Sequence, residues 1–277
     1  MGGYMKRLWI VMAALSAAVV MAMPASAVTD GELDGNGHPA VVLILMEENG
    51  APAFRCSGTL IAPTYVLTAG HCAGAPGEFS GMRIFTESDV QAGIGTTNNY
   101  PFAGPNAIEA VRWAAHPLYP FAPFFVHDVG MIELAQPFVL PGDEYGTLPA
   151  VDSLDARKTM RGLQKTTFTS VGYGLQRINP VFVEGSRTRY VAHPRLIQIN
   201  TPGFTGDFSL LLSNNTNTGG TCFGDSGGPN FYGSGATETR IVAAVTSFGI
   251  NGNCAGTGGV FRMDRQDVLD FVTPYLP

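Results

Sequence analysis

The segment Gly224-Asp225-Ser226-Gly227-Gly228-Pro229 places a serine between glycines. Nucleophilic catalysis requires a hydroxyl that a substrate carbonyl can reach. Glycine neighbours permit a tight turn, leave the hydroxyl uncovered and let a substrate approach the main-chain N–H groups. The segment therefore makes Ser226 a candidate nucleophile, which needs a base and an acid from elsewhere in the chain.

Chain order selects the partners of this serine. The same letters fit the Gly-x-Ser-x-Gly turn of α/β-hydrolases, in which the acid and the histidine follow the serine. The last histidine here is His193, so no base follows Ser226 and that alternative fails. The order histidine, acid, serine is available instead. Leu67-Thr68-Ala69-Gly70-His71-Cys72 offers His71, and the segment from His127 to Leu134 offers Asp128.

These three segments resemble the chymotrypsin/trypsin family of secreted serine endopeptidases. The Thr-Ala-Gly-His-Cys and Gly-Asp-Ser-Gly-Gly-Pro segments match the family literally, and the Asp128 segment resembles its Asp-Ile-Ala-Leu-Leu pattern with Val, Gly and Met substituted. The resemblance runs from Val28 to the C-terminal region, loosely between the motifs. It favours an active enzyme over a non-catalytic binding homologue, because all three residues are present. An esterase remains an alternative, since the same residues hydrolyse esters.

The resemblance implies a role for each residue. Ser226 attacks the scissile carbonyl to form an acyl-enzyme, His71 accepts its proton and returns it to the leaving amine, and Asp128 orients the imidazole. The backbone N–H groups of Gly224 and Ser226 form the oxyanion hole, each donor contributing about 3–4 kcal/mol in a related mechanism.

The resemblance also outlines a specificity pocket. Ser247-Phe248-Gly249 corresponds to the strand that pairs with an extended substrate, and Ser247 is placed to hydrogen-bond Asp128. Family members that cut after Arg or Lys carry an Asp six residues before the serine, where this chain has Gly220 followed by Thr221. Gly249 and Gly259 leave the entrance open. An unpaired buried cation is costly, so we expect a preference for uncharged, large apolar side chains.

Four cysteines allow three disulfide pairings. The family resemblance selects Cys56–Cys72, beside the histidine, and Cys222–Cys254, beside the serine. Loops of this size would stabilise the fold by about 3 kcal/mol each in the chain-entropy model. A zinc site is the rival explanation, but the chain has no short Cys-x-x-Cys spacing. We expect no metal and no cofactor.

The N-terminal stretch has the three parts of a secretory signal peptide: Lys6 and Arg7, an uncharged run from Leu8 to Met23, and a closing Ala25-Ser26-Ala27. A membrane anchor is the alternative reading, because the apolar run is long. Removal of residues 1–27 deletes two basic residues and no acidic one, which leaves 14 basic and 22 acidic residues, net charge −8, over 250 residues. We therefore expect an extracellular protein without stable membrane association after cleavage.

Cleavage after Ala27 would expose Val28 as a new N-terminus. In the family, activation inserts such a terminus and pairs its ammonium with the Asp before the catalytic serine, which is Asp225 here. Signal peptidase would then be the activating enzyme. Against this, Asp30 replaces a glycine in a segment that should be buried.

Short strands must position these residues. Compact apolar runs at 41–46, 65–67, 131–134, 168–171, 196–199 and 241–245 are separated by Gly, Pro, Asn and Asp clusters, which is typical of an all-β protein. The length suits two packed barrels, which the family resemblance makes six-stranded and antiparallel. We expect an N-terminal barrel over 28–145 and a C-terminal barrel over 146–277. Asp264 is predicted to cap a short C-terminal helix that buries residues 268, 269, 271 and 272.

Composition excludes other classes. Of 277 residues, 45% are hydrophobic and only 14% charged, which excludes disorder. A net charge of −6 argues against nucleic-acid binding. Four cysteines are too few for a small domain that depends on its disulfides. We expect a monomer whose partners are protein or peptide substrates.

Overall fold

The alternation of side chains in one strand explains how the chain forms two cores. A computed structural model describes residues 28–158, 165–179, 182–201 and 205–276. In β2 (Val41–Glu48), the first six residues are all buried. Val42 and Ile44 face the interior of the first half, whereas Val41 and Leu43 pack in a cluster that also holds Phe261 of the second half. A strand that is buried on both faces reads as an unbroken apolar run.

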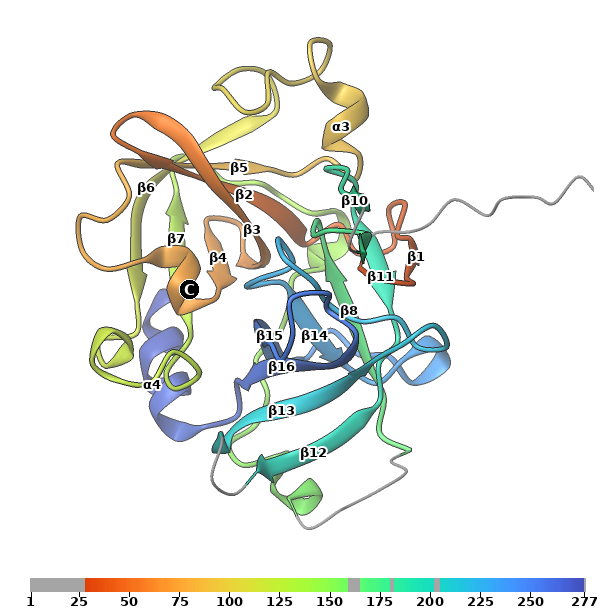
Figure 1. Ribbon diagram of the computed structural model, residues 1–277. Helices are drawn as coiled ribbons and strands as arrows, with labels where there is room; N and C mark the ends of the chain where they lie inside the picture. The colour runs from red at the N-terminus through yellow and green to blue at the C-terminus, as the bar shows by residue number, and fades with distance from the viewer. Residues whose placement is uncertain (1–27, 159–164, 180–181, 202–204, 277) are drawn as a thin grey trace, which may run out of the picture.

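The first half is a closed antiparallel barrel in the order β2-β3-β4-β7-β6-β5 (Figure 1). Its apolar interior joins β2 to β4 and β7 through Val66 and Ile132. Closure pairs both edges of every strand, so the barrel exposes no free sheet edge. Besides β2, its strands are β3 (Ala51–Ala62), β4 (Tyr65–Thr68), β5 (Gly81–Phe85), β6 (Ala107–Ala115) and β7 (Gly130–Leu134).

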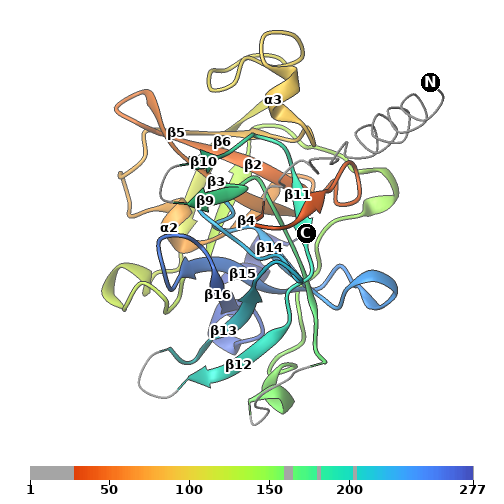
Figure 2. The ribbon, with the colours of Figure 1, turned by 45° about the vertical axis from the view of Figure 1, so that its right-hand side comes forward.

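The second half is a curled eight-stranded sheet in the order β1-β11-β8-β14-β15-β16-β13-β12. It lies beside the barrel in both ribbon views (Figure 2). Its strands are β1 (Glu32–Leu33), β8 (Phe168–Gly172), β11 (Tyr190–Ala192), β12 (Leu196–Thr201), β13 (Gly206–Asn214), β14 (Pro229–Tyr232), β15 (Val242–Gly249) and β16 (Gly256–Arg262). A separate hairpin joins β9 (Arg177–Asn179) to β10 (Phe182–Glu184). The all-β prediction is confirmed, with this sheet in the place of the second barrel.

The N-terminal segment belongs to the second half, because β1 pairs with β11. Buried Arg189 fastens the segment further: its guanidinium contacts Asp34 at 2.7 Å and donates to the carbonyl of Val41 in the barrel at 2.9 Å. One side chain thus holds together the N-terminal segment, the barrel and the approach to β11.

Helices are short. They are α2 (Gly70–Ala73), α3 (Val90–Gly93) and α4 (Gln266–Val272), with 3-10 turns at Tyr119–Phe121, Pro141–Asp143, Asp155–Arg157, Gly235–Thr237 and Thr273–Tyr275. As predicted, α4 buries Val268 and Leu269. The predicted cap is wrong, since Arg265 occupies the N-cap position without a side-chain cap bond. Asp264 is fully buried and instead pairs with Arg262 at 2.8 Å, because a buried guanidinium must have a charged partner.

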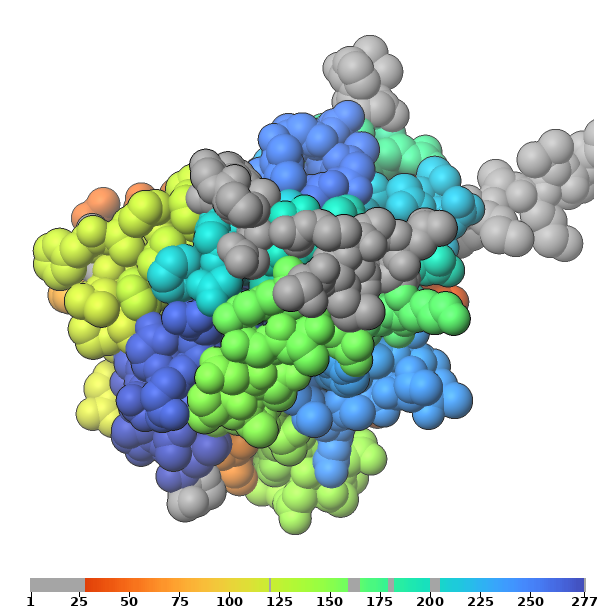
Figure 3. Space-filling model, turned by 90° about the horizontal axis from the view of Figure 1, so that it is seen from below, coloured from red at the N-terminus to blue at the C-terminus, as the bar shows by residue number. Residues whose placement is uncertain are grey.

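The C-terminal helix packs against the barrel through aromatic contacts, and in the view from below the dark-blue C-terminal residues lie beside the yellow-green segment of the first half (Figure 3). Phe271 makes an edge contact with His116, and Tyr275 makes one with Tyr65. The predicted signal peptide, 1–27, lies outside the described residues. Within the described ranges, no helix is long and apolar enough to cross a membrane. The division of the chain at residue 145 stays a prediction.

Candidate active site

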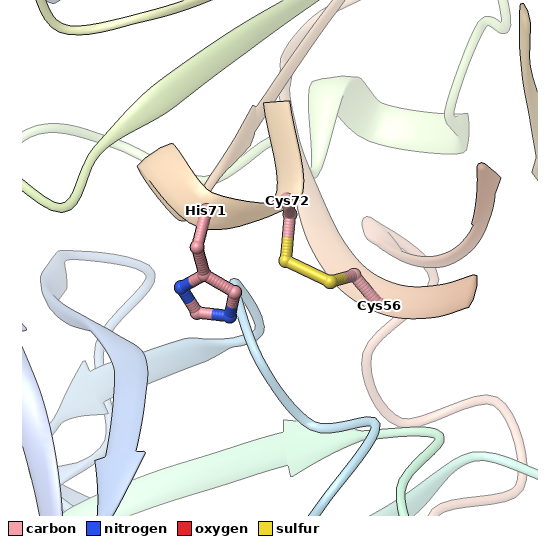
Figure 4. A group of neighbouring side chains, drawn as sticks. All are labelled: Cys56, His71 and Cys72. Carbon is pink, nitrogen blue, oxygen red and sulfur yellow. A yellow bond between two sulfur atoms is a disulfide. The ribbon is translucent and has the colours of Figure 1, made fainter. Parts of the chain in front are cut away.

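His71 lies on the short helix that follows β4. The helix begins after Ala69, and the Cys56–Cys72 disulfide ties it to β3 (Figure 4). Gly70 leaves room for a close neighbour: a Cβ there would lie 3.0 Å from the ring of Tyr119. The short helix that carries His71 is therefore fixed by a disulfide at Cys72 and packs closely against Tyr119 at Gly70.

Asp128 is fully buried beside His71, immediately before β7. Its carboxylate accepts the backbone N–H of His71 at 2.9 Å and lies 3.0 Å from His71 Nδ1. Ser247 Oγ donates at 2.5 Å to Asp128 Oδ2, the same oxygen that lies 3.0 Å from His71 Nδ1. Burial lowers the pKa of His71, but the charge and hydrogen bond of Asp128 raise it more, so its pKa lies above the usual value. The acid thus orients the ring and favours its charged form.

The loop that carries Ser226 is built around two glycines. Gly227 has φ +77°, and a Cβ there would lie 2.0 Å from Thr68 Oγ1. Gly224 has φ +95°, a conformation that side chains rarely adopt. The backbone of Ser57 donates to the carbonyl of Ser226 at 2.8 Å, and Ser57 Oγ donates to the carbonyl of Gly224 at 2.9 Å. Ser57 in the barrel therefore holds this loop of the second half from two sides.

Two N–H groups of this loop remain without an acceptor. The N–H groups of Asp225, Gly227 and Gly228 donate to backbone carbonyls, whereas within the described ranges those of Gly224 and Ser226 do not donate. Such paired donors can receive a developing oxyanion. Among the described residues no hydrogen bond joins Ser226 Oγ to His71, a contact that often forms only once substrate is bound.

Asp225 points away from the solvent and is fully buried. Its carboxylate accepts the N–H groups of Gly174 at 2.7 Å and Cys222 at 2.8 Å. Burial raises its pKa to about 7, although these hydrogen bonds and the charge of Arg55 act in the opposite direction. Asp225 thus organises the nucleophile loop but has no cation in contact with it among the described residues.

Val28, the predicted partner of Asp225, lies near the segment that leads into the nucleophile loop. Val28 is fully buried against Tyr190 and Ala192. The next residue, Thr29, forms an antiparallel bridge with Gly220. With residue 27 attached, the Val28 nitrogen is a peptide nitrogen and carries no charge. The segment that would donate the ammonium therefore already lies beside the strand that leads into the nucleophile loop.

A cavity of about 570 Å³ brings together His71 and Ser226. Of the predicted substrate-binding residues, Thr221, Ser247, Phe248 and Gly249 line it, as do Gly224 and the Cys222–Cys254 disulfide.

Gly220 and Gly259 are not part of the cavity lining. A Cβ on Gly220 would lie 2.3 Å from Asn214, and one on Gly259 would lie 2.2 Å from the Phe248 ring. A Cβ on the neighbouring Gly258 would lie 3.1 Å from Thr221 Oγ1. Gly259 therefore lies against Phe248, which itself lines the cavity, next to a shift of register between β15 and β16.

Among the residues that the structure describes, two groups of side chains have donor atoms close enough for a metal ion. One contains Cys56 and Cys72, whose sulfurs form a disulfide. The other contains His116, His127 and Asp267. Its imidazoles are stacked 4.6 Å apart with an interplanar angle of 8°, and Nδ1 of His116 accepts the N–H of Leu118. Lone pairs of parallel rings do not converge on one ion, so neither group is assigned a metal.

The comparisons with known proteins agree with this geometry. The family model described as Trypsin matches residues 31–263. The chain belongs to the trypsin family. It is thus a member of a family of serine endopeptidases, and the predicted resemblance is confirmed.

Individual relatives are distant. Phenoloxidase-activating factor 3 of Holotrichia diomphalia is 26% identical over 87% of this chain and 70% of its own length. Serine protease Hayan of Drosophila melanogaster is 32% identical over 39% of this chain, which spans only 16% of that relative. A solved structure titled HL collagenase matches with a TM-score of 0.65 at 19% identity, over 89% of this chain and 97% of the other. At that identity the structural match supports the fold alone.

Proposed function

We propose that this protein is a secreted serine endopeptidase that cuts peptide bonds through His71, Asp128 and Ser226. The observation that carries the proposal is the buried Asp128 carboxylate, held against His71 by two hydrogen bonds on the wall of a cavity that also holds Ser226. In the reaction, the Ser226 oxygen bonds to the scissile carbonyl carbon while His71 takes the hydroxyl proton. The N–H groups of Gly224 and Ser226 receive the oxyanion.

Collapse of this intermediate breaks the peptide bond, and His71 returns the proton to the leaving amine. Water then attacks the acyl-enzyme with His71 again as base, which releases the acid product and restores Ser226. The disulfides Cys56–Cys72 and Cys222–Cys254 fit an oxidising compartment, which supports secretion.

A phosphonate probe that modifies activated serines tests the mechanism. The parent protein should be labelled and should digest casein, whereas Ser226→Ala should lose the label and about 10⁶-fold in kcat. Ser153→Ala, at an exposed position, is the matched control. A folded parent protein that takes no label would favour a non-catalytic binding module. Turnover of a simple ester without casein digestion would favour an esterase.

We propose a preference for uncharged, large apolar side chains before the scissile bond. The polar group behind Gly220 is the amide of Asn214, whose nitrogen donates to the carbonyl of Thr221 at 2.9 Å. An amide neutralises no incoming guanidinium. Phe-ended reporter peptides should therefore be cleaved faster than Arg-ended ones, and a clear Arg preference would refute this specificity.

We also propose that the Val28 ammonium, once residues 1–27 are removed, pairs with Asp225. Addition of one alanine before Val28 should displace the charge and remove most of the activity. N-terminal sequencing of the active protein checks the processing site, and unchanged turnover of the extended protein would reject the mechanism.

A further inference from the structure

A second cavity adjoins the candidate active site and has no part in the mechanism above. It measures about 650 Å³ and shares Phe54 and Arg55 with the cavity that holds His71 and Ser226. Its other walls include Tyr100, Leu175, Gly185 and Arg187. We call this space, defined by Phe54, Arg55, Tyr100, Leu175, Gly185 and Arg187, the leaving-group groove.

The groove is positively charged and its charges are not balanced. None of the ion pairs among the described residues includes Arg55 or Arg187. Arg187 lies over the ring of Tyr100 at 5.3 Å and donates to Gln91 at 3.0 Å, but its Nε is buried without a hydrogen-bond partner. A buried guanidinium donor without an acceptor is costly, so a ligand with acceptor oxygens would stabilise the site.

The two guanidiniums also act on each other. Burial lowers the pKa of Arg55, and the like charge of Arg187 lowers it further, while Tyr100 and Asp225 raise it. Asp225 offers little compensation, because both of its oxygens are already bound to backbone N–H groups. An anion in the groove would relieve the repulsion between the arginines.

The groove adjoins the catalytic cavity at the wall that holds Arg55, Cys56 and His71. His71 returns its proton to the leaving amine, and the Cys56–Cys72 disulfide beside His71 leads along β3 to Arg55. The acyl side of the substrate is assigned to Ser247–Gly249, another part of the cavity wall. Arg55 lies against the nucleophile loop, since a Cβ on Gly224 would be 3.3 Å from its Nε. A peptide that runs past Ser226 therefore crosses Arg55 before it reaches Arg187.

We propose that the leaving-group groove binds the carboxylate of an acidic substrate residue, located two to four positions after the cleaved bond, through Arg55 and Arg187. The inference rests on the proposed endopeptidase function and deepens it. Guanidinium groups bind carboxylates through parallel N–H···O bonds, which suits two arginines on adjoining walls. The position directly after the bond is excluded, because Glu78 lines the catalytic cavity and repels an acid there. The substrates are thus polypeptides with Asp or Glu shortly after the cut.

Quenched fluorescent peptides test this proposal. All carry the same residues before the bond and an amidated C-terminus, and Glu, Gln or Lys stands at the second, third or fourth position after it. At one of these positions we expect kcat/KM for Glu to exceed that for Gln by about tenfold, and that for Lys by more. The difference should shrink at high salt, because ions screen charge pairs near the surface. A Gln peptide with a free C-terminal carboxylate separates side-chain recognition from recognition of a chain end.

Variants assign the effect to the arginines. Arg187→Gln should reduce the Glu-to-Gln ratio several-fold, and the Arg55→Gln/Arg187→Gln double variant should bring it close to one. Arg195→Gln, which alters an exposed arginine elsewhere, should leave the ratio unchanged. Each ratio is independent of the fraction of folded enzyme, because both peptides meet the same preparation. A parent enzyme without a Glu preference, or a preference that survives in the double variant, would overturn the proposal.

The failure of this inference differs from failure of the proposed function. A parent enzyme that is labelled by the phosphonate and cleaves all three peptides equally retains the endopeptidase function and loses only the acidic subsite. A parent protein that is neither labelled nor able to cleave any peptide refutes both. A preference found only for the free C-terminal carboxylate refutes side-chain recognition.

Discussion

At the scale of a single residue, Asp128 shows how burial makes a carboxylate depend on the hydrogen-bond donors around it. With no exposed surface, its carboxylate depends on protein donors: the backbone and ring of His71 and the hydroxyl of Ser247. Each contact holds the acid in one orientation, and the acid holds the imidazole. The sequence motif names Asp128 and His71, but this set of donors is visible only in the folded chain.

Asp128→Asn should reduce kcat by about 10⁴-fold near neutral pH, as in a related triad, because the ring loses its orientation and its stabilising charge. His71 must be neutral to act as base, so activity of the parent falls as pH drops through its raised pKa. Removal of the Asp128 charge lowers that pKa, and the acidic limb of the residual activity should move to lower pH. The profile of kcat/KM against pH measures both effects, with exposed Asp143→Asn as control. An unmoved limb would contradict the assignment.

The nucleophile loop is the informative element, because its conformation depends on an acid that does not face the substrate. Asp225 accepts two backbone N–H groups, and its buried carboxyl has a pKa of about 7 while residues 1–27 are attached. Protonation and pairing with an ammonium are two different ways to neutralise this group. The contribution of this loop to stability should therefore depend on pH before residues 1–27 are removed, and not afterwards.

In the chain that retains residues 1–27, folded Asp225 keeps its proton up to about pH 7, whereas the unfolded residue releases it near 3.8. The folded state then binds more protons between these values, so the free energy of unfolding should fall as pH rises from about 4 to 7. The slope is at most about 1.4 kcal/mol per pH unit. Denaturant unfolding at several pH values measures it.

Asp225→Asn should remove this part of the decline, and so should a chain that begins at Val28, whose ammonium replaces the proton. Asp143→Asn again serves as the control. If the variant and the parent decline equally between pH 4 and 7, the buried carboxyl is not the titrating group.

At the scale of the whole molecule, Arg189 holds the N-terminal segment against the barrel. Its guanidinium and the Asp34 carboxylate are both fully buried in contact with each other. Arg189→Ala should cost about 3–5 kcal/mol of unfolding free energy, because it breaks a fully buried ion pair and leaves His38 as the remaining cation beside the Asp34 carboxylate. Urea denaturation measures the loss, and Arg195→Ala at an exposed site should change little. The double variant Asp34→Asn/Arg189→Met should lose less than the single one, and an equal loss would argue against charge as the cause.

The sequence predicted the strands well, because apolar runs are local signals. Its glycine-flanked motifs named the three candidate catalytic residues, whose roles stay predictions. It predicted the cap of α4 wrongly, since the local preference of Asp264 for a helix start is overridden by buried Arg262. It placed Gly259 in the pocket, an assignment that stays a prediction, and it did not foresee that Gly259 pairs with Phe248 and lies against the ring of that residue. It gave no sign of the leaving-group groove, because Arg55 and Arg187 are far apart in the chain and meet only through tertiary packing.

The hydrogen bonds from Ser57 to the nucleophile loop also affect when the active site forms during folding. The Ser57 hydroxyl reaches the carbonyl of Gly224 across 167 residues of sequence, and contacts between such distant residues form late, after the entropy of closing the loop has been overcome. On the proposed assignment, His71 and Asp128 belong to one folding unit and Ser226 to another. A newly synthesised molecule then acquires proteolytic activity only at the end of folding. On this proposal, copies that fold side by side cannot digest one another until each has docked its two halves.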